Sequence, residues 1–152
     1  MIQRKQTLFL FAAMILTIVC LCLPLGRFSD TATIGNGATL YNLWLVDENG
    51  GRDFSVWALF ADLLITCPIA IMSIFSYKNR IVQSRFCMFN ILLILGWYAI
   101  FAALALHISA AYKNFEISFA SVLPALSLIL YFMARKAILA DEALVKAADR
   151  IR

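Results

Sequence analysis

Four stretches of the chain are apolar over a length that can cross a lipid bilayer, and polar or charged segments separate them. A helix needs about 20 residues to span a hydrocarbon core of about 30 Å. The sequence therefore predicts an all-α membrane protein, a four-transmembrane-helix bundle. Its spans are expected at about residues 7–25, 56–75, 88–110 and 117–134.

The segment between the first two spans, residues 26–55, has the pattern of a small β structure. Residues 31–34 and 39–46 are rich in β-forming side chains, and residues 35–37 and 47–51 contain the Gly, Asn and Asp that favour tight turns. We expect a β-hairpin or a sheet of two or three strands on the outer mouth of the bundle. Helix or lipid contact would have to stabilise it, because a lone hairpin is marginal in water.

The same loop is unusually apolar around Tyr41 and Trp44, which makes it a candidate outer-loop surface. It could bind a partner protein or a lipid. Alternatively, Leu43 and Leu45 cap the bundle while Tyr41 and Trp44 lie at the level of the lipid headgroups, which amphipathic rings prefer. We favour the second interpretation.

Residues 135–152 form a second segment after the transmembrane domain of residues 1–134. They are strong helix formers without Gly or Pro, and they predict a cytoplasmic amphipathic helix. Asp141 falls on its apolar side, where a carboxylate is unfavourable against lipid but acceptable opposite an Arg or Lys of the inner loop or of a partner. We therefore favour protein over lipid as the docking surface. The apolar side contains Ile138, Leu144, Val145 and Ile151.

Composition and charge indicate how the chain lies relative to the membrane. An apolar fraction of 63% and a charged fraction of 14% exclude a water-soluble fold. Ten of the 13 Lys and Arg residues lie at the N-terminus, between the second and third spans, or in the tail. Basic residues in short loops stay on the cytoplasmic side, so both termini are expected there. The net charge of +4 then reflects topology rather than nucleic-acid binding.

The first span follows Arg4 and Lys5, as the apolar part of a secretory signal would. Residues 20–27 offer no small-x-small cleavage pattern. We therefore expect a first span that is retained in the membrane.

Asp62 and His107 are the candidate intramembrane polar pair. A carboxylate inside a span is costly and usually faces a partner in the bundle interior. The second span runs inward and the third outward, which brings both residues to a similar depth near the outer surface. The pair could carry protons, or it could be a structural contact that fixes helix register. We favour the structural contact, because no polar path continues inward from Asp62.

No pattern typical of catalysis, cofactor binding or metal binding is present, so we expect no catalytic residue, cofactor or metal ligand. The four cysteines lie within or beside the spans, where free cysteine behaves as a small apolar residue. The pair Cys20 and Cys22 points to different sides of a helix, and neither a disulfide nor a metal site is expected.

Two resemblances concern the whole chain. The opening of the chain, the Pro24-Leu25 pair and the tail resemble a Bacteroidetes four-span inner-membrane protein family of unknown function. That resemblance implies the inner membrane of a two-membrane bacterium and no established activity. The tail motifs that carry it are Arg135-Lys136-Ala137-Ile138, Asp141-Glu142-x-Leu144-Val145 and Ala148-Asp149-Arg150-x-Arg152, and the opening is Met1-Ile2-Gln3-Arg4-x-Gln6-Thr7.

The architecture is also similar to the claudin type, with four helices and a sheet grown from the first outer loop. Asn42-Leu43-Trp44 is faintly like the Gly-Leu-Trp of that family's loop. No cysteine lies between Cys22 and Cys67, so the family's disulfide and its junction-forming role do not carry over.

The sequence thus predicts an integral inner-membrane protein, and we favour an accessory or scaffold subunit over an enzyme. Its expected contacts are the lipid bilayer and a membrane protein partner or a second copy, with no nucleic acid. The alternative is a small transporter or a lipid- or quinone-handling membrane enzyme centred on Asp62 and His107.

Overall fold

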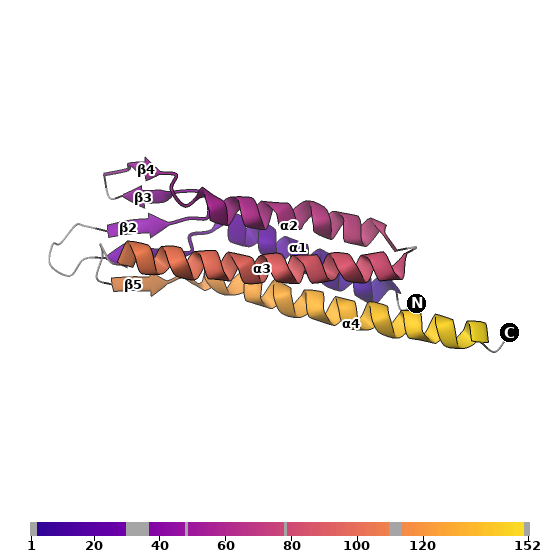
Figure 1. Ribbon diagram of the computed structural model, residues 1–152. Helices are drawn as coiled ribbons and strands as arrows, with labels where there is room; N and C mark the ends of the chain where they lie inside the picture. Colours follow the sequence, from indigo (N-terminus) through magenta and orange to yellow (C-terminus); the bar gives the residue numbers. More distant parts are fainter. Residues whose placement is uncertain (1–2, 30–36, 48, 78, 110–113, 151–152) are drawn as a thin grey trace.

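The computed structural model describes residues 3–29, 37–47, 49–77, 79–109 and 114–150; the side chains of residues 3–5 and 148–150 are excepted. Four helices lie side by side, and a small antiparallel sheet covers one end of them (Figure 1). The helices are α1 (Gln3–Cys22), α2 (Trp57–Phe75), α3 (Arg80–Ser109) and α4 (Leu123–Arg150), with a 3-10 turn, η1 (Phe119–Val122), before α4. The strands are β1 (Gly26–Ser29), β2 (Gly37–Leu40), β3 (Leu45–Asp47), β4 (Arg52–Asp53) and β5 (Asn114–Ile117).

Three helical segments are long and apolar enough to cross a membrane: Trp57–Phe75, Arg80–Ser109 and Phe119–Ala147. The apolar part of α1, Gln6–Cys22, is shorter. The expected second span at residues 56–75 coincides with α2 almost residue for residue. Long apolar helices are therefore confirmed, together with a small antiparallel sheet.

Two helices begin at other residues than the predicted spans. The third helix begins at Arg80, eight residues before the predicted apolar stretch, because helical hydrogen bonding continues through the polar residues that precede it. The fourth helix does not begin at Ile117, which is the last residue of β5; after η1 the helix starts at Leu123. Helix α4 then runs without a break past residue 134, so the tail is an extension of the same helix.

The sheet has five strands in the order β4-β3-β2-β1-β5, and every neighbouring pair is antiparallel. It is larger than the two or three strands expected, because β5, from the connection between α3 and α4, pairs with β1. The β-rich segment at residues 39–46 is not one continuous strand: the backbone N–H of Tyr41 donates to the carbonyl oxygen of Trp44 (2.9 Å), and this turn separates β2 from β3. The predicted strand at residues 31–34 lies outside the described residues.

The predicted turn at residues 47–51 is confirmed where the structure describes it. Gly50 has a φ of 76°, in the left-handed region that glycine adopts without a steric penalty. Its N–H donates to the carbonyl of Asp47 (2.9 Å), and the N–H of Asp47 donates to the carbonyl of Gly51 (3.0 Å). The turn joins β3 to the short edge strand β4.

Gly26 is required where β1 and β5 approach each other. A Cβ atom there would lie 2.6 Å from Cε2 of Phe115 and 2.8 Å from the carbonyl oxygen of Glu116. We expect Gly26→Ala to lower the free energy of unfolding by about 1–2 kcal/mol, as at other overpacked sites. Thermal unfolding in detergent measures this, with Gly51→Ala as the control, because its Cβ would meet only Asp47 Oδ2 at 3.6 Å. Equal stability of both variants would contradict the expected clash.

Two clusters of buried side chains form the core. The outer cluster joins the buried face of the sheet to the helices through Phe28, Leu40, Leu59 and Trp97. The inner cluster lies between the helices and contains Leu10, Ala70, Ile94, Tyr131 and Ile138. The sheet is therefore part of the same folded unit as the helices.

Candidate functional site

The structure does not join the expected pair Asp62 and His107. Asp62 is half-buried on α2, and its Oδ2 atom is buried without a hydrogen-bond partner among the described residues. His107 is exposed near the end of α3. No hydrogen bond or ion pair between the two occurs in the described part of the chain. The proton-carrying interpretation therefore has no connected donor and acceptor in this structure.

The polar contact at the outer end of the helices is made by a different residue, Asn42. It is fully buried, and its Nδ2 donates to the backbone carbonyl of Cys20 (2.7 Å). Its Oδ1 accepts from Nε1 of Trp97 (3.2 Å). The β2–β3 turn is thus tied to α1 and to α3 by one side chain. In the sequence, Asn42 stands out only within the claudin-like Asn42-Leu43-Trp44, and no local pattern indicates this role.

Trp97 and Tyr98 are packed rather than open to a cavity. Trp97 is fully buried, and its ring stacks on Phe101 with centroids 5.2 Å apart. The hydroxyl of Tyr98 donates to the carbonyl of Ser121 (2.7 Å) at the start of α4. Both rings hold α3 against its neighbours.

Tyr41 and Trp44, the candidate outer-loop surface, form a half-buried aromatic group beside β4. Their ring centroids lie 6.1 Å apart, and Trp44 makes an edge contact with Phe54 at the same distance. The guanidinium of Arg52 lies over the Trp44 ring, 5.1 Å from its centroid. This arrangement is compatible with rings at the level of lipid headgroups and offers no enclosed ligand site.

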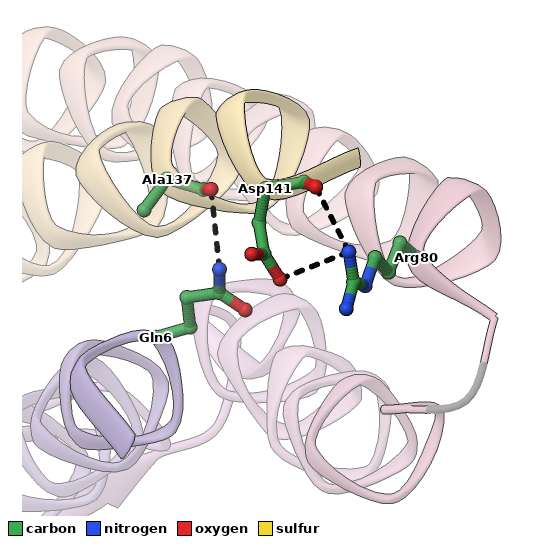
Figure 2. A network of polar contacts seen from close by, with 4 residues as sticks. All are labelled: Gln6, Arg80, Ala137 and Asp141. Carbon is green, nitrogen blue, oxygen red and sulfur yellow. Dashed lines mark hydrogen bonds and ion pairs between the residues drawn. The ribbon is translucent and has the colours of Figure 1, made fainter. Parts of the chain in front are cut away.

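At the opposite end, α4 is fixed by two side chains from other helices (Figure 2). Nε2 of Gln6 donates to the carbonyl oxygen of Ala137 (3.1 Å). Nη1 of Arg80 contacts both Oδ2 of Asp141 (3.1 Å) and the backbone carbonyl of Asp141 (2.9 Å). The Arg80 and Asp141 side chains are mostly buried, with 24% and 12% of their surfaces exposed. The two contacts bind α4 to α1 and to the start of α3, and we call them the inner clamp.

The candidate docking residues of the tail divide at the inner clamp. Ile138 is fully buried in the inner core cluster, and Asp141 faces Arg80. Leu144 and Val145 are exposed by 60% and 45%, and Ile151 lies outside the described residues. Glu142 accepts from Lys146 (2.7 Å), one turn along the same helix. The first part of the tail therefore docks on its own chain, and the next part does not.

An open groove lies beside the inner clamp, between the start of α3 and the end of α4. Its volume is about 670 Å³. Apolar side chains of Ile81, Val82 and Val145 line it, together with the polar residues Asn79, Arg80, Glu142 and Lys146. We call this the inner groove. A mixture of apolar and charged lining residues is usual for a small protein-binding surface.

Among the described residues, no group of three or more His, Cys, Asp or Glu side chains is arranged to bind a metal ion. All four cysteines are free. The polar contacts described above are structural: they tie the sheet to the helices at one end and α4 to the bundle at the other.

Comparison with known proteins gives a family without a known role. The sequence model of a domain of unknown function, DUF4293, matches residues 2–151. No curated protein matches the chain.

Proposed function

Because this chain belongs to the DUF4293 family over nearly its whole length, and the family has no known function, we propose a role from its own structure. We propose an integral inner-membrane protein of a two-membrane bacterium that spans the bilayer four times with both termini in the cytoplasm. It acts as a non-enzymatic accessory or scaffold subunit and binds a protein partner through the inner groove and the end of α4.

The surface of the helices supports membrane insertion. Large apolar side chains point outward along their length: Leu64, Leu95, Ile129 and Phe132 are each about half exposed. Water would oppose so much exposed apolar surface, and lipid would cover it. Helix α1 has a shorter apolar part, but it lies alongside the three longer helices and would cross with them.

The arrangement of the ends supports the orientation. The start of α1, the connection between α2 and α3, and the end of α4 lie at one end of the bundle, and the sheet lies at the other (Figure 1). The end of the bundle that lies away from the sheet carries five basic residues, Arg80, Arg85, Arg135, Lys136 and Lys146. Basic residues near span ends favour the cytoplasmic side. The sheet would then lie outside the membrane.

Cysteine labelling tests the orientation. In a variant whose four native cysteines are replaced by alanine, a membrane-impermeant maleimide applied from the periplasmic side should label a cysteine at Asn49. It should not label one at Ala147, although both positions are exposed. Permeabilised cells should label both, which controls for reactivity. Labelling at Ala147 without labelling at Asn49 in intact cells would reverse the topology.

The observation that carries the proposed partner is the end of α4. Helix α4 projects beyond the other helices past the inner clamp (Figure 1). The projecting residues 142–150 would add roughly 14 Å of helix. They start from a fixed point, because Arg80 holds Asp141, yet Leu144 and Val145 remain exposed, and Val145 lies beside Ile81 and Val82 in the inner groove. A rigid helix with unpaired apolar side chains suits helix-in-groove recognition by a partner protein.

The charges beside this surface favour a protein over lipid headgroups. Arg80 is paired with Asp141, and Lys146 is paired with Glu142. In the described part of the chain, both cations that line the inner groove therefore already face a carboxylate. An anionic headgroup would have to displace these acids, whereas an apolar side chain of a partner can occupy the centre and leave both ion pairs intact.

Site-specific photocrosslinking in cells tests the partner. A photoreactive residue at Val145 should crosslink to one protein, and the same residue at Leu95, exposed on the lipid-facing side of α3, should not. The double variant Leu144→Ser/Val145→Ser should abolish co-purification of that protein. The matched control Ala143→Ser/Ala147→Ser changes two exposed positions on the same helix segment and should keep it. Lipid adducts alone at Val145 would overturn the proposal.

The alternative function, a small transporter or a lipid- or quinone-handling enzyme centred on Asp62 and His107, is favoured by one observation. Oδ2 of Asp62 is buried without a hydrogen-bond partner in the described residues, and intramembrane carboxylates are usually functional. Asp62→Asn keeps the shape and removes the charge. If Asp62→Asn abolishes the protein's activity in the cell while folding and partner binding are unchanged, this alternative is supported over the scaffold.

A further inference from the structure

A group of buried polar atoms lies between α3 and α4, away from every contact described above. Asn90 and Tyr131 are fully buried. Among the residues that the structure describes, there is no hydrogen-bond partner for either polar atom of the Asn90 amide, for the Tyr131 hydroxyl, or for Nε of Arg135. Buried polar atoms are nearly always hydrogen-bonded, and in a membrane the cost of leaving them unbonded is high.

The helix register places these residues at one level, and the inner core cluster places them in the same part of the bundle, because Cys87, Ile91, Tyr131 and Ala134 all belong to it. Arg80 and Asp141 are in contact at the inner clamp, and α3 and α4 run in opposite directions from there. Asn90 follows Arg80 by ten residues and Tyr131 precedes Asp141 by ten, so both lie roughly 15 Å from the clamp at the same level. Arg135 lies one helical turn nearer to the clamp, where it interacts electrostatically with Cys87, one turn from Asn90.

We propose that Asn90, Tyr131 and Arg135 form an internal binding site for a small oxygen-bearing polar molecule, entered from the inner end of the bundle. The Asn90 amide offers two N–H donors and one acceptor oxygen, the Tyr131 hydroxyl one donor and one acceptor, and Nε of Arg135 another donor, so four donor hydrogens face two acceptor atoms. Arg135 has no acidic partner among the described residues. This surplus of donors and positive charge selects oxygen atoms, which either water or the carbonyl or carboxylate of a small solute can supply.

Arg135 provides the entry. Its Nε atom is buried, but the residue as a whole is partly exposed, so part of its side chain is accessible from the surface. Long basic side chains near span ends commonly extend toward the interface in this way. The site does not depend on the proposed protein partner, because the inner groove and the end of α4 lie on the other side of the clamp.

The chain contains a matched control for occupancy. Asn42 is as fully buried as Asn90, but its amide is bonded to Cys20 and Trp97. In full-length protein labelled with ¹⁵N-asparagine in lipid nanodiscs, water-edited solid-state NMR should transfer magnetisation from water to the side-chain amide of Asn90. The Asn42 amide should receive none. The spectrum of Asn90→Leu identifies the Asn90 signal.

Thermal unfolding provides a second, independent readout. If the site is occupied, Asn90→Leu and Tyr131→Phe remove hydrogen bonds, and each should lower the melting temperature by several degrees. If the site is empty, both variants remove an unsatisfied polar group, and the melting temperature should rise or stay unchanged. The sign of the shift therefore decides occupancy.

Mass spectrometry of small molecules extracted from wild type and from Asn90→Leu separates the two sources of oxygen. If wild type retains a solute at one equivalent, the variant loses it, and no magnetisation passes from water to Asn90, that solute occupies the site. If magnetisation passes from water to Asn90 and no such solute is found, water occupies the site. The site is overturned if both variants are as stable as wild type or more so. It is also overturned if they are less stable while neither water nor solute reaches Asn90, because its partner is then another protein group.

Discussion

Replacing Asn42 with leucine should lower the free energy of unfolding by about 2–5 kcal/mol. The substitution removes two buried hydrogen bonds, from Asn42 Nδ2 to the Cys20 carbonyl and from Trp97 Nε1 to Asn42 Oδ1. It also leaves the Trp97 N–H without this acceptor inside an apolar cluster. The attachment of the sheet to α1 and α3 should weaken first, so Trp97 fluorescence should change at a lower temperature than helical circular dichroism.

Two comparisons isolate the cause. Asn49→Leu changes an exposed asparagine of the same loop and should shift stability by less than about 0.5 kcal/mol. The double variant Asn42→Leu/Trp97→Phe should cost less than the sum of the single variants, because phenylalanine has no N–H left to satisfy. A stability of Asn42→Leu equal to that of wild type would mean that these two hydrogen bonds contribute nothing to the fold.

The helices could be predicted because bilayer thickness imposes a length on apolar segments that is visible without knowledge of any contact. Residues 56–75 show this most clearly, since α2 covers nearly the same range. Helix ends were less predictable. Arg80 is polar and lay outside the expected span, but it belongs to α3, where its side chain is used in the inner clamp.

The sheet was only partly predictable, because its pairing is long-range. Ile117 reads as the first apolar residue of a span, yet it pairs with Gly26, which is far away in the sequence. Local composition also favoured one strand through Asn42, whereas the structure makes a turn there. A polar residue inside an otherwise apolar run was the available signal, and only the position of Trp97 explains it.

The candidate sites could likewise be predicted only where local sequence determines them, and not where long-range packing does. The location of Asp141 on the apolar side of a helix predicts that it needs a basic residue, but helical periodicity cannot choose among Lys78, Arg80 and Arg85. Packing of α4 against the start of α3 makes that choice in favour of Arg80. Similar depth alone suggested a contact between Asp62 and His107. Depth does not specify which way a side chain faces, and the structure leaves His107 exposed.

Replacing Arg80 with alanine should release the end of α4 and lower the free energy of unfolding by about 2–4 kcal/mol. Removal of one member of a buried ion pair leaves the other charge uncompensated, which typically costs about 3–5 kcal/mol. The partial exposure of both side chains reduces that figure. Arg80 also donates to the Asp141 carbonyl (2.9 Å), so the variant removes a contact to the helix backbone as well.

The expected structural result is a more mobile helix end. A spin label at Ala147 should become more mobile in Arg80→Ala, while a label at Leu126, far along α4 from the clamp, should not change. Arg80→Lys keeps the charge but loses the planar guanidinium, so its stability should lie between those of Arg80→Ala and wild type. Arg85→Ala removes an exposed arginine five residues along α3 and should leave stability and label mobility unchanged.

Loss of the clamp should also weaken the proposed partner surface, because Val145 would no longer be held beside Ile81 and Val82 in the inner groove. In Arg80→Ala, crosslinking from Val145 to its protein partner should therefore fall although none of the apolar contact residues has changed. If the spin label loosens and crosslinking is unaffected, the partner binds α4 alone and the inner groove has no part in recognition. If neither measurement changes, Arg80 does not position the helix.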